Sequence, residues 1–469
     1  MKTKTFVTVL MMWVLCLSAP AQEYGQYYKD LPVAIPQVKT PVIPGRTVKL
    51  SDYGAVGDGV TLVTEALQKA INEVAKQGGG HVVVEAGIWL TGPITLKDGI
   101  DLHLERNAML VFSPDKILAM KKDDKTGEWK DRAEPGISAS KRHDISITGE
   151  GTIDGNGEWW RPVKRGKVSD TEWKDYRDMG GTVSADGQLW YPFGLHHFDD
   201  IVQNAEAQEK LRAHLIRLTD CERVLISGVT VQNSPRFHIV PQRCQNVVID
   251  GVTVRCPWNA QNGDAIDIGN SKNVLIVNNI VDAGDDGICM KGGAGATGVK
   301  NGPCENILIQ DNTIYHAHGG FVIGSEFSGG MKNIVVRRCL FSGTDTGLRF
   351  KSAVGRGGKT ENIYISDITM SDIRGEGIIF ETTYWDNHVG AKKDDSQKKM
   401  EYVPDFGDIH ISNIVCRGCK TAISAHSEEG MIHDVTINDA VFFYTKKSTD
   451  IDATCDVKLN NVRLETFER

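Results

Sequence analysis

The sequence predicts an all-β protein built as a parallel β-helix. From about residue 143 onward one phrase returns eight times, as in ERVLISGVTV, QNVVIDGVTV and ENILIQDNTI, and each copy reads as two short alternating strands joined by a turn. The first apolar residues of successive phrases, from Val224 to Ile409, lie 23 to 46 residues apart. Repeats of this length without helices indicate stacked coils of strands, because each coil buries its apolar face only against its neighbours.

The first 21 residues predict a secretory signal peptide. Lys2 and Lys4 precede an apolar run, and the small residues Ala19 and Ala21 suit cleavage before Gln22. A lipid anchor on Cys16 is the alternative. We therefore expect an exported protein, periplasmic or extracellular, with a lead segment at 22–46 and a single β-helix domain at 47–469.

Composition agrees with a folded, exported domain. The chain has 469 residues, 40% of them hydrophobic, and a formal net charge of -8. That charge argues against a nucleic-acid partner, but an acidic substrate stays possible because the local field matters more than the sum. No later stretch is apolar enough to span a bilayer. The nine cysteines after Cys16 read as small buried apolar residues, with one disulfide possible.

Two segments depart from the repeat. In residues 62–80 apolar residues recur every four positions, at Leu62, Ala66, Ala70 and Val74, before a run of three glycines, which predicts a short amphipathic helix that caps the solenoid. Residues 156–214 are rich in tryptophan, tyrosine and charge without periodicity. We interpret them as long ordered loops inserted beside a groove.

A third strand recurs once per coil, as in GDAIDIGN, DGICMKG and GLRFKSA, and these strands should stack into one sheet. Their polar residues, which come from a span of nearly ninety residues, are expected to line one groove. They are Asp264, Asp285, Asp286, His318, Arg349 and Lys351.

This set of side chains fits the hydrolysis of a glycosidic bond. The reaction needs one carboxylic acid to protonate the leaving oxygen and one carboxylate to activate water. Crowding Asp285, Asp286 and Asp264 makes at least one of them keep its proton near neutral pH. Arg349 and Lys351 can bind a carboxylate on the sugar.

The series NGD (262–264), GDDGICMK (284–291), HAHGG (316–320) and LRFK (348–351) resembles the motifs of polygalacturonases, glycoside hydrolase family 28. The resemblance runs from about residue 47 to the C-terminus. It implies a right-handed parallel β-helix of the pectin-lyase-like kind that hydrolyses α-galacturonosidic bonds with inversion, without a metal or other cofactor. The expected partner is an acidic galacturonan polymer or oligomer, and the expected state is a monomer.

The resemblance also implies roles for individual residues. Asp285 is similar to the general acid, and Asp264 with Asp286 to the pair that positions and deprotonates water. His318 would tune the acid, with His316 as a rival for that role. Arg349 and Lys351 would bind the galacturonate carboxylate.

Four further residues are candidates for substrate binding. His238 matches a position where family members carry a substrate-facing histidine, although a structural role stays open. Tyr384 can pack against a sugar ring. Asn262 begins the NGD motif, and Asp267 can line the groove, or only cap backbone amides.

By analogy with members that act from chain ends, the inserted loops at 156–214 favour exo-cleavage. The alternatives are hydrolysis of rhamnogalacturonan or substituted galacturonan, elimination by a pectate-lyase-like β-helix with an arginine base and calcium, and a non-catalytic glycan-binding β-helix. A lyase is disfavoured because no cluster of extra carboxylates reads as a calcium site.

Overall fold

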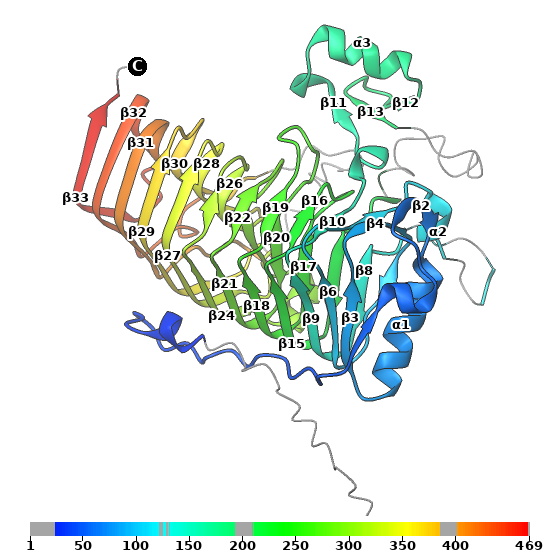
Figure 1. Ribbon diagram of the computed structural model, residues 1–469. Helices are drawn as coiled ribbons and strands as arrows, with labels where there is room; N and C mark the ends of the chain where they lie inside the picture. Colours follow the sequence, from blue (N-terminus) through cyan, green and yellow to red (C-terminus); the bar gives the residue numbers. More distant parts are fainter. Residues whose placement is uncertain are drawn as a thin grey trace, which may run out of the picture.

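The computed structural model describes residues 24–121, 125–127, 130, 132–192, 209, 211–384 and 401–467. The predicted fold is confirmed: strands of successive coils pair in parallel and stack into one right-handed β-helix (Figure 1). Three strands per coil give the solenoid three long sheet faces. The predicted signal peptide lies outside the described residues.

One face, which we call the cleft sheet, carries the third strand of each coil. Ile239, Ile266, Ile288 and Phe321 are in register on consecutive strands and point inward. Residues between them, such as Asp267, therefore point outward. The strands are β5 (Ile94–Thr95), β8 (Ile137–Ser140), β14 (Ile216–Thr219), β17 (Ile239–Gln242), β20 (Ile266–Gly269), β23 (Ile288–Lys291), β26 (Gly319–Gly324), β28 (Thr346–Lys351), β30 (Glu376–Glu381) and the end of β31 (Ile409–His426).

The second face begins each repeated phrase. At its first bend an asparagine in the left-handed region recurs from coil to coil, for example Asn273 (φ 54°), Asn306 (φ 58°) and Asn333 (φ 53°). Their side chains hydrogen-bond to one another, which lines up the coils. The strands are β1 (Thr47–Lys49), β3 (Gly80–Val84), β6 (Ile100–Leu104), β9 (His143–Gly149), β15 (Glu222–Ser227), β18 (Gln245–Asp250), β21 (Lys272–Val277), β24 (Cys304–Gln310), β27 (Met331–Ser342), β29 (Thr360–Ser371), β31, β32 (Val435–Ile451) and β33 (Val457–Thr466).

The third face contains short strands, because each phrase ends there in a turn toward the cleft sheet. In the later coils, β27, β29, β31 and β32 continue around the corner and supply this face as well. The separate strands are β2 (Asp58–Leu62), β4 (Gly87–Thr91), β7 (Ala108–Phe112), β10 (Thr152–Asp154), β16 (Thr230–Gln232), β19 (Thr253–Arg255), β22 (Ile280–Asp282) and β25 (Thr313–Ile314).

The predicted capping helix is α1 (Thr64–Lys76), which closes the N-terminal end of the core. Its buried face consists of Leu67, Ala70, Ile71 and Val74. The sequence predicted that the apolar face of this helix starts at Leu62 and recurs every four residues. Its start was wrong, because Leu62 lies in β2 and is 45% exposed. Leu67 and Ile71 widen the apolar stripe instead, as a helix packed on a core requires.

The lead segment, residues 24–46, runs along the outside of the second face (Figure 1). Tyr24, Ile35 and Val38 pack there against outward-facing apolar residues of several coils. The contacted residues include Val248, Leu275, Leu308 and Val335. The segment also contains a short helix, η1 (Gly25–Tyr28). It thus covers an apolar stripe that the solenoid alone would expose to water.

The described cysteines are all unpaired thiols, and all but Cys455 are buried, as expected of small apolar residues. None of the described helices is both long and apolar enough to cross a bilayer. The remaining helices are short: η2 (Leu50–Tyr53), α2 (Lys116–Ala119) and α6 (Gly295–Asn301).

Residues 156–214 are called the inserted region, and residues 156–192 of it form a lobe beside the solenoid (Figure 1). A three-stranded sheet and a helix with a Ser169 capping box build the lobe around the buried Trp173, Trp190 and Tyr191. Its elements are η3 (Gly157–Trp159), β11 (Val163–Lys164), η4 (Arg165–Lys167), α3 (Asp170–Asp178), β12 (Thr182–Val183) and β13 (Leu189–Tyr191).

Candidate active site

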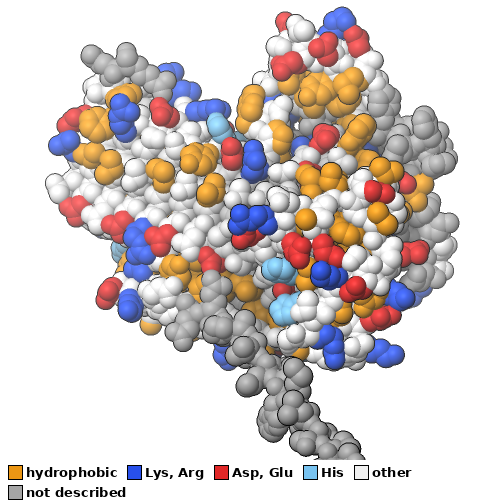
Figure 2. Space-filling view, in the orientation of Figure 1, with side chains coloured by type: hydrophobic (Ala, Val, Ile, Leu, Met, Phe, Trp, Pro, Cys, Tyr) orange, Lys and Arg blue, Asp and Glu red, His pale blue; other side chains and the backbone are white. Residues whose placement is uncertain are grey.

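A cleft of about 910 Å³ lies over the cleft sheet. Its lining combines residues of five strands with Lys164, Glu209 and His214 of the inserted region. In Figure 2 the surface is hollowed between the inserted lobe and the C-terminal coils, and charged side chains of both signs gather there. Of the residues predicted for the site, the cleft lining contains Asn262, Asp264, Asp267, Asp285, Asp286, His318, Lys351 and Tyr384.

The backbone holds the acidic motifs of neighbouring coils together. Ala265 donates its N–H to the carbonyl of Asp286 at 2.9 Å, and His318 donates its N–H to the carbonyl of Asp285 at 2.9 Å. Each motif ends a turn and begins a strand, so the side chains emerge at one edge of the sheet. Three coils thus deliver Asp264, the Asp285–Asp286 pair and His318 to one place.

Asp285 pairs with His318, whose Nδ1 lies 2.9 Å from the Asp285 Oδ1. Burial alone would raise the pKa of Asp285, but the charges of His318 and then Lys351 outweigh it and hold that pKa well below its usual range. Nε2 of His318 lies 3.8 Å from Asp345, so the imidazole is held between two acids. His318 is therefore in direct contact with the carboxyl group that the sequence suggests as the general acid.

Asp286 is held by the two cations of the LRFK motif. The Lys351 ammonium donates to its Oδ2 at 2.8 Å, and an Arg349 nitrogen lies 3.6 Å from its Oδ1. Burial would raise the pKa of Asp286, but Lys351 in particular lowers it below its ordinary value. Asp286 is therefore ionised, as a carboxylate that accepts a proton must be.

Asp264 and Asp267 are the acids that keep a proton. Asp264 is 3% exposed and one of its carboxyl oxygens has no hydrogen-bond partner, as is true of both oxygens of Asp267. Burial, followed by the charges of Asp285 and Asp267, raises the pKa of Asp264 well above its ordinary value. Burial raises the pKa of Asp267 to about 7, against the opposing charge of Lys291.

Tyr384 gathers the cations at the other side of the acids. Its ring centroid lies 5.2 Å from the Arg349 guanidinium, 4.9 Å from the Lys351 ammonium and 5.6 Å from the Arg356 guanidinium. Cations over an aromatic face are stabilised by the ring quadrupole. The ring therefore holds positive charge beside the acids.

His238 lies beneath the cleft and does not face it. The side chain is 0% exposed, its Nδ1 lies 2.8 Å from the Asp264 carbonyl, and its Nε2 accepts from the Ser234 N–H at 3.2 Å. Burial lowers the pKa of His238 to about 4, so the ring is neutral. His238 is thus not part of the cleft lining, and its full burial and its hydrogen bonds to the backbone of Ser234 and Asp264 favour the structural role that the sequence left open.

The contacts of two other candidates, Asn262 and His316, show whether each lies in the cleft. Asn262 lies in the cleft wall, where its Oδ1 accepts from Arg212 at 2.8 Å. His316, the rival of His318, is paired with Asp282 at 2.9 Å, and neither residue lines the cleft. His318 is thus the histidine that meets the acids.

Sequence reasoning missed five cations of the cleft lining: Arg132, Lys164, Arg217, Arg236 and Lys291. Lys291 follows Met290 in GDDGICMK and alternates with it, so the rule that placed Lys351 outward also predicts Lys291 outward. The charges of Cys289 and Asp267 raise the pKa of Lys291 well above its ordinary value in spite of burial. Lys291 therefore stays charged in the cleft lining that it shares with the acids.

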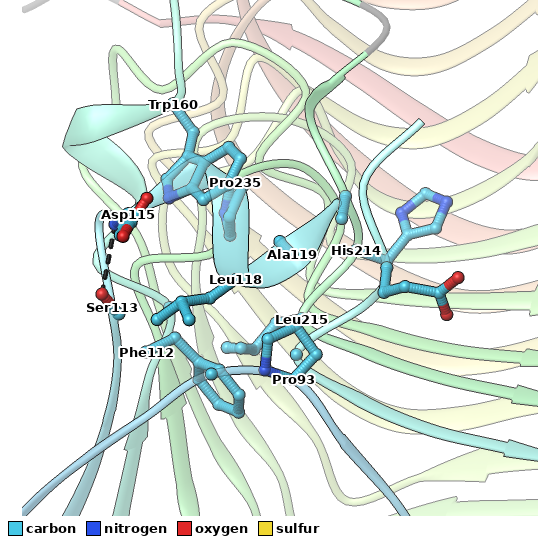
Figure 3. Close-up of a pocket in the computed structure, with 15 residues that line it drawn as sticks. Pro93, Phe112, Ser113, Asp115, Leu118, Ala119, Trp160, His214, Leu215 and Pro235 are labelled. Carbon is cyan, nitrogen blue, oxygen red and sulfur yellow. Dashed lines mark hydrogen bonds between the residues drawn. The ribbon is translucent and has the colours of Figure 1, made fainter. Parts of the chain in front are cut away.

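The inserted region is anchored to the solenoid next to the cleft. Trp160 is 5% exposed and packs in a small apolar cavity of about 30 Å³, with Pro235 beside it (Figure 3). Leu118 and Leu215 lie on the other side of this cavity, and His214 stands at its edge. Because His214 lines both the cavity and the cleft, the anchored wall is also the wall of the cleft.

Asp285, Asp286 and His318 each offer one oxygen or nitrogen atom, and these three atoms lie within 4.8 Å of one another. A divalent cation can bind to atoms at this spacing. These groups already have partners, since Lys351 forms an ion pair with Asp286 and His318 contacts Asp285. A metal would have to displace these partners. The donor set therefore fits acid–base chemistry better than a metal centre.

Comparison with known proteins gives a consistent result. The model of the family described as "Glycosyl hydrolases family 28" matches residues 176–459. The chain is 30% identical to the exo-poly-alpha-D-galacturonosidase of Dickeya chrysanthemi over 445 residues, 90% of this chain and 71% of that protein. It is 27% identical to the endo-polygalacturonase of Pectobacterium carotovorum over 75% of this chain and 77% of that protein. The exopolygalacturonase of Thermotoga maritima superposes with a TM-score of 0.70 at 31% identity, covering 92% of this chain and 95% of that chain.

Proposed function

This chain belongs to glycosyl hydrolases family 28, and on that premise we propose that it hydrolyses the α-galacturonosidic bonds of pectic galacturonan from a chain end. The observation that carries the proposal is that Asp264, Asp285, Asp286, His318 and Lys351 line one cleft, with Arg349 next to Asp286. The acids can catalyse cleavage of the bond, and the cations can bind a negatively charged sugar.

Attack from a chain end is supported by the wall of the cleft and by two of the relatives. The inserted region contributes Lys164, Glu209 and His214 to the lining, so one end of the cleft meets a lobe. The relatives from Dickeya chrysanthemi and Thermotoga maritima are described as exo-acting. A polymer that meets a wall can be cut only near its end.

In the proposed reaction Asp285 donates a proton to the leaving glycosidic oxygen as the bond between that oxygen and the anomeric carbon breaks. A water molecule forms the new bond to the anomeric carbon from the opposite face and gives its proton to Asp286. Asp264 helps to orient this water. The product has inverted configuration, because there is one displacement.

His318 has a defined place in this scheme. In the free protein Asp285 contacts His318 and its pKa is held low, so substrate that excludes water from this pair must favour protonation of the carboxyl group before it can act as the acid. Lys291, Arg349 and Lys351 keep the neighbouring carboxylate Asp286 ionised. The raised pKa of Asp264 makes it the rival proton donor.

A time course separates the possible reactions. We expect wild-type enzyme on polygalacturonic acid to release monomer from the start, with little early loss of viscosity and no ultraviolet absorption. Early long oligomers would indicate endo-cleavage, and an absorbing unsaturated product would indicate a lyase. Activity that disappears with chelator would contradict the metal-free mechanism. Binding without turnover would favour a glycan-binding β-helix.

A second experiment identifies the proton donor. A nitrophenyl galacturonoside has a leaving group that needs no protonation, so removal of the general acid costs little on it and about 10² to 10⁴-fold on a natural oligomer. We expect Asp285→Asn to keep activity on the aryl substrate, and Asp264→Asn and Asp286→Asn to lose activity on both substrates. The reverse result for Asp285 and Asp264 would move the acid role to Asp264.

Substrate binding is proposed to use both cations of LRFK. Arg349 offers a planar pair of donors and Lys351 a point charge to the carboxylate of the sugar beyond the cleaved bond. Tyr384 supports these cations, and Asp267 and Asn262 are further contacts in the cleft. Branched or rhamnose-containing pectic fragments remain the alternative substrates, and a panel of such oligomers tests them.

Export and a monomeric state are also part of the proposal. The predicted signal peptide at 1–21 supports export to the periplasm or the cell exterior. N-terminal sequencing of the secreted protein is expected to begin at Gln22. Size-exclusion chromatography with light scattering is expected to give one chain of about the sequence mass, 51.5 kDa before cleavage.

A further inference from the structure

Two arginines line the end of the cleft that adjoins the inserted region. Arg217 projects outward from β14, and Arg236 lies in the turn before β17. Arg236 packs on Phe237, with its guanidinium 5.3 Å from the ring centroid, and His214 packs on the same ring at 4.8 Å. These two arginines have no part in the acid–base scheme above.

Neither arginine has an acidic partner among the residues that the structure describes. Arg217 donates to one neutral group, the Oε1 of Gln242 at 2.8 Å. Nε of Arg236 is buried without any hydrogen-bond partner. A buried unpartnered donor on a charged group is costly to the free protein.

The arginines around them are paired. Arg243, on the next coil, is held by Asp220 through two hydrogen bonds of 2.7 and 2.9 Å. Arg212 is held by Glu209 and by the Asn262 Oδ1. Among the residues that the structure describes, acids therefore form ion pairs with these two nearby arginines but not with Arg217 or Arg236.

Other arginines repel both charges. Burial and the neighbouring Arg132 lower the pKa of Arg217, and burial and Arg212 lower the pKa of Arg236 against the opposing charges of Glu209 and Asp264. Burial and the surrounding arginines, Arg236 first among them, hold the pKa of His214 well below its ordinary value, so this ring stays neutral. Positive potential is thus concentrated at one end of the cleft, and an entering anion would relieve it.

We propose that Arg217 and Arg236 form a second carboxylate-binding site, which receives the carboxylate of the terminal uronate at the closed end of the cleft. The inference rests on the proposed function, because it assumes a uronate chain that ends at the inserted wall. It goes further by stating that the enzyme recognises a carboxylate on each side of the cleaved bond.

The register of the cleft sheet supports this placement. Arg217, Asp267 and Arg349 lie on one outward row, with Asp267 two strands from Arg217 and three from Arg349. Five strand spacings separate the two arginines by roughly 24 Å at the backbone. Two long side chains that lean toward the acids can reach sugars on either side of a bond cleaved between them.

Such a site selects the chemistry of the chain end. A terminal uronate supplies the missing anion, whereas a neutral sugar or a methyl ester leaves both guanidinium groups unpaired in a low-dielectric wall. Bidentate pairing of guanidinium and carboxylate is the geometry that such a pocket provides. The terminal carboxylate therefore determines which chain ends are accepted.

The test compares Arg217→Gln and Arg236→Gln with Arg243→Gln, which removes the same charge from a paired arginine outside the cleft. Two substrates are used: trigalacturonate, and the same trimer with its terminal carboxyl reduced to the alcohol. We expect each cleft variant to raise KM for trigalacturonate about tenfold, while KM for the reduced trimer and all constants of Arg243→Gln change less than about twofold. Equal losses on both substrates, or no loss, would overturn the inference.

Direct binding keeps the inference separate from the catalytic proposal. Calorimetry of galacturonate, with galactose as the neutral control, needs no turnover. We expect wild type and Arg243→Gln to bind two galacturonates, one at Arg349 and Lys351 and one at Arg217 and Arg236, and each cleft variant to keep only the first, with thermal midpoints equal to or above wild type because a repulsion is removed. Binding of two galacturonates that survives Arg236→Gln and Arg217→Gln would refute the site. If wild type binds galacturonate through these arginines but cleaves no galacturonan, the proposed function alone fails.

Discussion

On the inward face of the cleft sheet, equivalent positions of successive coils all carry apolar residues. On the outward face the residue type differs from coil to coil. The inward row consists of Ile266, Ile288, Phe321, Leu348 and Ile378, in register from strand to strand. The outward row one residue along consists of Asp267, Cys289, Val322, Arg349 and Ile379. The same backbone carries both rows.

The difference follows from what each face contacts. An inward side chain meets its own copies above and below, so any apolar residue of suitable size is satisfied and the pattern is periodic. An outward side chain meets different neighbours in each coil, and no stacked copy of itself forces it to repeat, whether it is buried as Cys289 and Val322 are or lines the cleft as Asp267 does. A charged residue that departs from the repeat and lines the cleft is therefore a candidate for function.

The largest effect is expected from Asp285→Asn on the outward side. Loss of the proton donor should lower kcat on galacturonate oligomers by about 10³ to 10⁴-fold, while the thermal midpoint stays within a few degrees of wild type. Asp282→Asn is a matched control, because Asp282 forms the equivalent pair with His316 outside the cleft. Comparable loss of activity in both variants would break the distinction between the two positions.

Phe350→Ala tests the inward face. Phe350 is 0% exposed and stacks on Phe380 with ring centroids 4.3 Å apart. Removing the ring leaves a cavity and should lower the free energy of unfolding by about 4 kcal/mol. Activity per folded molecule is expected to fall far less than in Asp285→Asn, although Arg349 and Lys351 flank the site. Denaturant unfolding and active-site titration measure the two quantities, and an inactive but fully stable variant would contradict the comparison.

Asp267→Asn tests a residue with a feature of each face. Asp267 points outward, yet it is only 2% exposed. Its pKa is raised to about 7 from 3.8, so the native state binds a proton that the unfolded chain releases between these values. Wild-type stability should therefore fall as the pH rises from about 4 to about 7. The asparagine variant is expected to match wild type at pH 4 and to exceed it at pH 8 by up to about 4 kcal/mol. Identical stability differences at both pH values would show that Asp267 ionises freely.

The smallest effect is expected under the lead segment. There the outward row of the second face is apolar and does repeat, because residues 24–46 cover it. Tyr24 donates its hydroxyl to Asp250 at 3.2 Å, so Tyr24→Phe should lower the free energy of unfolding by about 1 kcal/mol without changing kcat. An effect on catalysis would mean that the second face communicates with the cleft.

The periodic part of the molecule was predictable from the sequence, because the inward rows of all coils obey one rule. The phrases with Val247, Val274 and Ile307 stack in register as expected. The acids of the cleft could be found because Asp285 and Asp286 break the repeat in an obvious way. Their meeting with Lys351 follows from stacking alone.

What escaped prediction depends on contacts that no local pattern encodes. His238 could be assigned to a coil, but only packing decides that its ring is fully buried. Arg217 and Arg236 look like ordinary charged residues until the structure shows that no acid in the described part of the chain forms an ion pair with them. The lead segment has no repeat, so its docking on the second face had no sequence signal.

The attachment of the lead segment has a consequence for how the chain is completed. Arg337 donates to the carbonyls of Tyr27 at 3.1 Å, Lys29 at 3.0 Å and Asp30 at 3.3 Å, across more than three hundred residues of sequence. The segment made early therefore cannot be fastened until the coil that holds Arg337 has been synthesised and folded. The apolar stripe on the second face therefore stays exposed in an incomplete chain until about two thirds of its length has emerged. An exposed apolar surface favours aggregation, so this is the interval in which a chaperone is needed most.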